Sequence, residues 1–162
     1  STIHLKIHLH KMGTFVKTKT TNMSLTIHHY LPFLLLFMLV LAVVKSFLVS
    51  YAGKDLCLEK CKILSITMIL AHLQLVFGII LFYKKSSEIL DWSVVMSNTD
   101  SRYTFVEHPL MMLLAIILIS VGRVKAKKIE DSKKSAKTIF TYFLIALILI
   151  LLRTPFDKLF MF

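Results

Sequence analysis

With 162 residues, 56% of them hydrophobic, and a mean hydropathy of +0.73, the chain is too apolar for a soluble domain of its size. Its composition predicts an integral membrane protein in a lipid bilayer. The formal charge of +11 does not indicate a nucleic-acid-binding protein, because the basic residues cluster beside apolar runs and lack aromatic or glycine-rich binding motifs. We expect no nucleic-acid partner, and we expect the basic residues to attract anionic lipid head groups.

Residues 1–22 are polar and basic, and they lack the apolar core that a signal peptide needs. This composition predicts a disordered basic leader. Met23 directly precedes the first apolar run, so one hypothesis is that the natural chain starts there and that the leader is not native. Residues 23–162 are predicted to form a single four-span transmembrane domain.

The four predicted spans rest on length and hydropathy. A membrane helix needs about 20 mostly apolar residues, because each residue adds about 1.5 Å along the helix axis. Four runs approach this length, at about residues 25–44, 63–83, 103–122 and 137–152. The predicted fold class is therefore all-α, a transmembrane four-helix bundle.

The third span is informative because its uncharged part, residues 109–122, reaches only about 21 Å as a helix. Arg123 limits an extension forward, so the span must extend backward and take Glu107 and His108 into the membrane. Asn98, Thr99 or Asp100 can cap this helix, and Pro109 is expected to kink it.

Charge sets the predicted orientation. The connection between the first two spans and the connection between the last two carry most of the lysines and arginines: Lys45, Lys54, Lys60, Lys62, Arg123, Lys125, Lys127, Lys128, Lys133, Lys134 and Lys137. The positive-inside rule places both connections in the cytoplasm. Both termini are then expected to lie outside the cytoplasm.

Histidines within the apolar runs are the main indication of function, since ionisable groups in a span are costly and usually functional. The candidates are His28 with its neighbour His29, His72, and His108 beside Glu107. Helical rise places His72 about 14 Å, His108 about 21 Å and His28 about 24 Å from the cytoplasmic ends. All three are expected in the outer half of the bundle, where they can share a site.

A haem in a helical bundle needs axial ligands on both faces, and imidazoles on separate helices meet that need. His108 is the expected first ligand, with His28 or His72 as the second. The same three histidines can instead hold a non-haem metal, or each can form a hydrogen bond between helices. Glu107 can support a ligating imidazole, join a metal's ligands, relay protons, or lie among head groups.

Three parts of the sequence resemble a known family. Residues 71–83, residues 106–112 with Glu107-His108-Pro109, and Gly122-Arg123 before a lysine-rich stretch are similar to small four-span bacterial membrane proteins labelled cytochrome b-like. That family's first span opens with a histidine, a small residue, an aromatic residue and Leu-Arg. Residues 28–32 match this opening in part, with Pro32 in place of the arginine, which puts a charged contact to a haem propionate there in doubt.

The resemblance implies haem b and electron transfer in the bacterial inner membrane. It places His28, His72, Glu107 and His108 on matching positions without selecting the ligand pair. The prediction is therefore a multi-pass electron carrier, or an accessory subunit, rather than a stand-alone enzyme, with other membrane subunits or redox partners beside it. Two alternatives stay open: a non-catalytic accessory or assembly subunit, and a non-haem metal or proton-handling protein.

Overall fold

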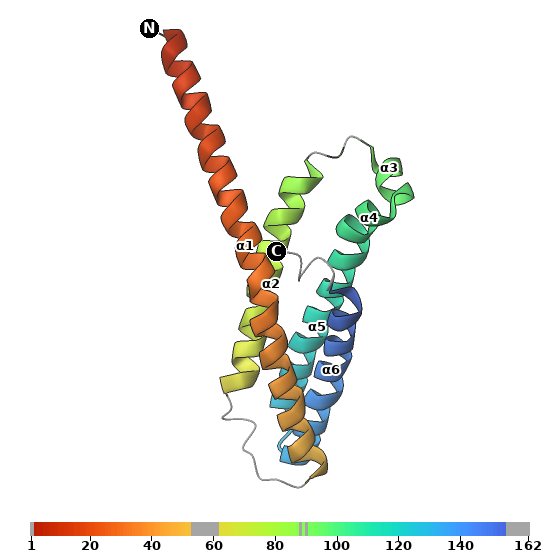
Figure 1. Cartoon of the computed structure of the whole chain (residues 1–162). Coiled ribbons are helices and arrows are strands. Elements are labelled where there is room, and N and C mark those ends of the chain that lie inside the picture. The colour runs from red at the N-terminus through yellow and green to blue at the C-terminus, as the bar shows by residue number, and fades with distance from the viewer. Residues whose placement is uncertain (1, 53–61, 88, 90, 155–162) are drawn as a thin grey trace.

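The structure is a computed structural model that describes residues 2–52, 62–87, 89 and 91–154, and of residues 2–22 it describes the backbone alone. These residues form helices and short connections, with no strand among them (Figure 1). The elements are α1 (Thr2–Tyr51), α2 (Lys62–Ser86), α3 (Trp92–Ser97), α4 (Thr99–Arg102), the π-helix η1 (Tyr103–Glu107), α5 (His108–Lys127) and α6 (Ser132–Arg153). The predicted all-α fold class is confirmed.

Four long helices lie side by side as a bundle (Figure 1). Helix α1 packs against α2 and α6, and α6 also packs against α5, whereas α2 and α5 touch much less. Helices α1 and α5 therefore lie diagonally across the bundle. We call the end where α5 ends and α6 begins the basic end, because Lys125, Lys127 and Lys128 lie there, and we call the opposite end the α3 end.

Four helical stretches are long and apolar enough to cross a membrane: Met23–Tyr51, Lys62–Ser86, Thr99–Lys127 and Ser132–Arg153. They contain the four predicted spans and extend beyond each of them. The third helix also continues past Arg123, which is 7% exposed and lies within α5 instead of ending it. These stretches agree with a multi-pass membrane protein.

Small side chains fill the interfaces between the helices. Ala42, Ser46, Ala115, Ala136 and Ala146 are all 0% exposed. Lipid chains are as apolar as leucine, so helices in a membrane associate through close packing, which small residues permit. Larger residues complete the core between these contacts, with Leu39, Ile119 and Phe143 fully buried.

The start of the third span follows the prediction in part. The Asn98 side chain accepts a hydrogen bond from the Ser101 N–H at 3.0 Å, so Asn98 is the cap. At Pro109 the sequence predicts a kink, and the structure has a π-helix just before it, in which the His108 N–H bonds the Tyr103 carbonyl. Because Pro109 has no N–H to donate, the helical hydrogen-bond pattern changes at this place.

Two aspartates cap helices outside the apolar stretches. Asp91 begins α3, and the hydrogen bonds from Ser93 hold the pKa of the Asp91 carboxyl below its usual range. Asp131 begins α6 by accepting from the N–H groups of Lys133 and Lys134 at 2.9 and 3.2 Å. The lysine-rich stretch is therefore largely helical.

The start of helix α1 differs from the prediction for residues 1–22. The sequence predicts a disordered leader over residues 1–22, whereas α1 is continuous from Thr2. Extending an existing helix by one residue adds a hydrogen bond and needs no new nucleus, and residues 2–22 contain no proline to stop it.

Candidate functional site

Polar side chains from all four long helices, from α4 and from η1 meet near the α3 end of the bundle. We call this group the polar cluster. Its members are His28 of α1, Gln74 of α2, Arg102 of α4, Tyr103 and Glu107 of η1, His108 of α5 and Arg153 of α6. Polar side chains at such a depth are expensive, so their convergence on one place indicates a site.

Helix α2 holds His28 through an amide. The Gln74 Nε2 lies 3.1 Å from the His28 carbonyl oxygen and 3.1 Å from the His28 Nδ1. An amide nitrogen only donates, so the His28 Nδ1 must accept, and the neutral ring carries its proton on Nε2. The ring also lies against Gly78, where an added Cβ would come 3.3 Å from the His28 Cε1.

The end of α6 holds His108 in the opposite tautomer. The His108 Nδ1 lies 3.1 Å from the Arg153 carbonyl oxygen, and the Tyr103 hydroxyl donates to the same oxygen at 2.6 Å. A carbonyl only accepts, so the His108 Nδ1 carries the proton and Nε2 keeps its lone pair. Helix α6 ends at Arg153, so this carbonyl takes side-chain donors in place of a helical N–H.

Glu107 lies between two arginines. Its Oε1 is 3.1 Å from the Arg102 Nε, and its Oε2 is 2.9 Å from the Arg153 Nη1. The three side chains are 30–39% exposed, so water reaches them in part. These ion pairs join α4, η1 and α6 at the α3 end, and they leave Glu107 little capacity to coordinate a metal.

The two cluster histidines face each other from diagonal helices. Their ring centroids are 6.4 Å apart, and the ring planes are 80° to each other. In the neutral pair, His28 offers an N–H at Nε2 and His108 offers a lone pair at Nε2. No hydrogen bond joins the two rings among the described residues, so a proton would pass between them through a bridging water.

His72 lies outside the cluster. Its side chain is exposed on α2, and its Nδ1 lies 2.7 Å from the Met68 carbonyl of the same helix. Residues two apart on a helix point about 200° from each other, so turning Gln74 inward turns His72 outward. The structure therefore brings His28, Glu107 and His108 together without His72. His29 packs edge-on against Tyr30 and Phe33 on α1.

Replacing His72 by leucine should leave the free energy of unfolding unchanged or slightly raised, because the new side chain suits hydrocarbon. Gln74→Leu, two residues away, should lower it by about 1 kcal/mol, since hydrogen bonds between membrane helices contribute about 0.6 kcal/mol each. Unfolding of both variants in one detergent would measure the difference. A loss of unfolding free energy that is larger for His72→Leu than for Gln74→Leu would contradict the position of His72 on the exposed face of α2.

Several cluster residues were not expected from the sequence to act together. Gln74 and Arg153 were not among the candidate residues. Both lie at polar positions in or beside apolar runs, as do Arg102 and Tyr103. The signal that separates them from ordinary interface residues is their shared depth, and that appears only when the helix ends are known.

The cluster does not fit a metal ion with three or more protein ligands. Among the described residues, no group of three or more His, Cys, Asp or Glu side chains is arranged so that it could hold a metal ion. The three predicted metal ligands are divided, because His28 and His108 lie together and His72 is on the outer face of α2.

A haem between His28 and His108 needs a lone pair on the facing nitrogen of each ring. His108 fits, because the Arg153 carbonyl fixes its lone pair on Nε2. His28 does not fit, because Gln74 donates to Nδ1 and leaves the proton on Nε2. Reversing the Gln74 amide would place its oxygen against the His28 carbonyl oxygen, and two acceptors cannot form a hydrogen bond. The side chains as arranged therefore do not fit a haem with two histidine ligands.

Comparisons of the chain with protein-family models, with curated proteins and with solved structures find no match.

Proposed function

We propose that the protein is a proton-handling membrane protein that takes up and releases one proton at the His28–His108 pair. The observation that carries this proposal is the opposite tautomers of two facing imidazoles, fixed by Gln74 and by the Arg153 carbonyl. Histidine is the side chain whose ordinary pKa allows such exchange near neutral pH.

The proton enters at His108. In the neutral pair, the His28 Nδ1 is occupied by the Gln74 amide, whereas the His108 Nε2 has no hydrogen-bond partner among the described residues. An incoming proton therefore binds to the His108 Nε2. The imidazolium that forms keeps its Nδ1–H on the Arg153 carbonyl, and a positive charge is favourable at the C-terminal end of α6.

The pair exchanges protons with one side of the membrane. Glu107, Arg102 and Arg153 are partly exposed at the α3 end and connect the pair with water there. About three helical turns farther toward the basic end, Leu39, Ile119 and Phe143 are fully buried apolar side chains between the helices. The positive-inside rule places the basic end in the cytoplasm of a bacterial cell, so exchange occurs with the outer side.

Such one-sided exchange suits an accessory subunit that responds to external pH or supplies a proton to a neighbouring membrane protein. It does not by itself move protons across the membrane. This proposal unites two of the alternatives that the sequence leaves open.

Nitrogen NMR of histidine-labelled protein in nanodiscs tests the proposal. We expect the Nε2–H tautomer at His28, the Nδ1–H tautomer at His108, and protonation of His108 as the pH falls. In vesicles, only a change of pH on the side of the membrane that the α3 end faces should change the protonation of His108. His72→Gln is the matched control and should change none of these signals. Equal tautomers on both rings, or a His108 that does not titrate, would overturn the proposal.

Haem-based electron transfer is the second candidate, and one observation favours it. His28 and His108 approach from diagonal helices, and His108 has the carbonyl partner typical of a ligating histidine. Haem binding would require the Gln74 amide to reorient. An absorption spectrum of purified protein, oxidised and then reduced, decides between the two candidates: a Soret band lost in His108→Ala supports haem, and a colourless folded protein excludes it.

A further inference from the structure

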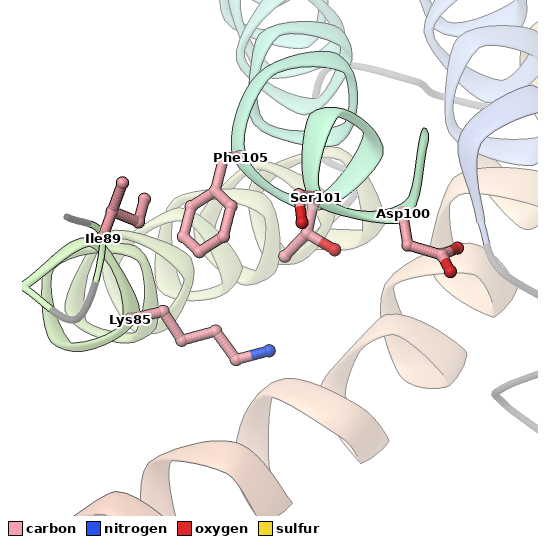
Figure 2. A pocket seen from close by; sticks show the side chains of 6 residues that line it. Lys85, Ile89, Asp100, Ser101 and Phe105 are labelled. Carbon is pink, nitrogen blue, oxygen red and sulfur yellow. The ribbon is translucent and has the colours of Figure 1, made fainter. Parts of the chain in front are cut away.

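A pocket of about 380 Å³ lies near the α3 end, apart from the polar cluster. Figure 2 shows its walls: Lys85 and Ile89 come from the end of α2 and the stretch after it, and the opposite wall comes from α4 and η1. The lining side chains are Lys85, Ile89, Asp100, Ser101, Thr104 and Phe105. This volume lies within the range of small-molecule sites, about 300–1,000 Å³.

The lining combines both charges with hydroxyls and an aromatic face. Lys85 extends past Phe105 toward Ser101 (Figure 2), and its ammonium has no hydrogen-bond or ion-pair partner among the described residues. The hydroxyls of Ser101 and Thr104 can donate to an anion beside that ammonium. The Asp100 carboxylate, on the same wall, can accept from a cation. The ligand with matching chemistry is a small zwitterion.

The position of the pocket points to a lipid. It lies where α2 leaves its apolar stretch, and Trp92, whose ring contacts the lining residue Phe105, is 52% exposed, as interfacial aromatic residues often are. The Phe105 ring is held edge-on between Phe82 and Trp92, at centroid distances of 6.1 and 6.5 Å. A head group at this level meets the pocket while its acyl chains stay in hydrocarbon.

We propose that this pocket binds a phosphoethanolamine zwitterion, supplied by the head group of a membrane lipid. The phosphate lies against Lys85 and the hydroxyls of Ser101 and Thr104, and the ammonium lies against Asp100 and the face of Phe105. The proposal depends on the membrane placement of the bundle and is independent of the proton exchange at the histidine pair.

Native mass spectrometry of the full chain in detergent, titrated with phosphatidylethanolamine or phosphatidylglycerol, tests this proposal. We expect the zwitterionic lipid to bind about tenfold more tightly, because phosphatidylglycerol has no ammonium for Asp100. Asp100→Asn should remove this preference, whereas Lys85→Gln should weaken the binding of both lipids, because both carry the phosphate that Lys85 contacts. Lys134→Gln, at the basic end, is the matched control and should keep it. Circular dichroism checks that each variant is folded, and exposed Lys85 and Asp100 are not part of the core.

Soluble glycerophosphoethanolamine separates the two sources of the ligand. If it displaces the lipid, the pocket recognises the zwitterion itself and also accepts a free one. If it does not compete while the lipid preference persists, the source is the membrane. Equal binding of the two lipids, a preference that survives Asp100→Asn, or lipid binding that Lys85→Gln leaves unchanged would overturn the proposal.

Discussion

Replacing Gly122 by alanine should lower the free energy of unfolding by about 1–3 kcal/mol, the usual cost of overpacking a core. The added Cβ would lie 2.5 Å from the Tyr142 Cβ, where α5 and α6 meet. A Cβ atom is fixed to the backbone and cannot rotate away, so the two helices must separate. A decrease in stability would indicate the close helix contact, because replacing glycine by alanine within a helix normally raises the stability by about 0.5–1 kcal/mol.

Gly78→Ala is the matched control for this change. Its Cβ would lie 3.3 Å from the Cε1 at the far end of the His28 side chain, which can move by a few tenths of an ångström. We expect the unfolding free energy of Gly78→Ala to stay within about 1 kcal/mol of the wild type. Reversible unfolding of both variants in the same bicelles measures the difference. An alanine at position 122 that stabilises the protein would contradict the close approach of α5 and α6.

Replacing Glu107 by glutamine should lower the free energy of unfolding by about 1–2 kcal/mol, after allowing for solvent screening of side chains that are about one third exposed. The amide keeps the shape of the carboxyl but offers one acceptor in place of two, and it removes the charge between Arg102 and Arg153. The contact between η1 and α6 should weaken, and the hydrogen bond from the His108 Nδ1 to the Arg153 carbonyl should weaken with it.

Lys134→Gln is the control for the charge change. The Lys134 Nζ lies 4.0 Å from the Asp131 Oδ2, and the Lys134 side chain is 78% exposed. Loss of this ion pair should therefore change the free energy of unfolding by less than about 0.5 kcal/mol. Thermal unfolding compares the two variants, and nitrogen NMR shows whether the His108 tautomer changes in Glu107→Gln alone. Similar stability losses in both variants would show that Glu107 acts only as a surface charge.

The fold could be predicted from the sequence because hydropathy and length act locally. A run of about 20 apolar residues has few alternatives to a membrane helix, since a lipid-exposed backbone must bond within itself. The inclusion of Glu107 and His108 in the third span followed from the same length requirement, and the helix over Thr99–Lys127 contains both. The π-helix before Pro109 could not be predicted, because a kink and a change of hydrogen-bond pattern fit the same sequence.

The candidate site could be predicted only in part. Counting helical rise places His28 and His108 at similar depths, and their rings do face each other. The same counting leaves His72 as a possible partner, because depth along a helix says nothing about direction around it. Packing against α1 turned Gln74 inward, and His72 therefore points away from the cluster.

The sequence by itself determined the class of the protein, its four helices, the depth of its ionisable residues and the distribution of its charge, because each depends on the order of residues along one helix. Only the tertiary structure decided which of these residues meet and which tautomer each histidine has. These features depend on the rotation of every helix about its axis and on the carbonyl at the end of α6. Both are set by close packing between segments far apart in the chain.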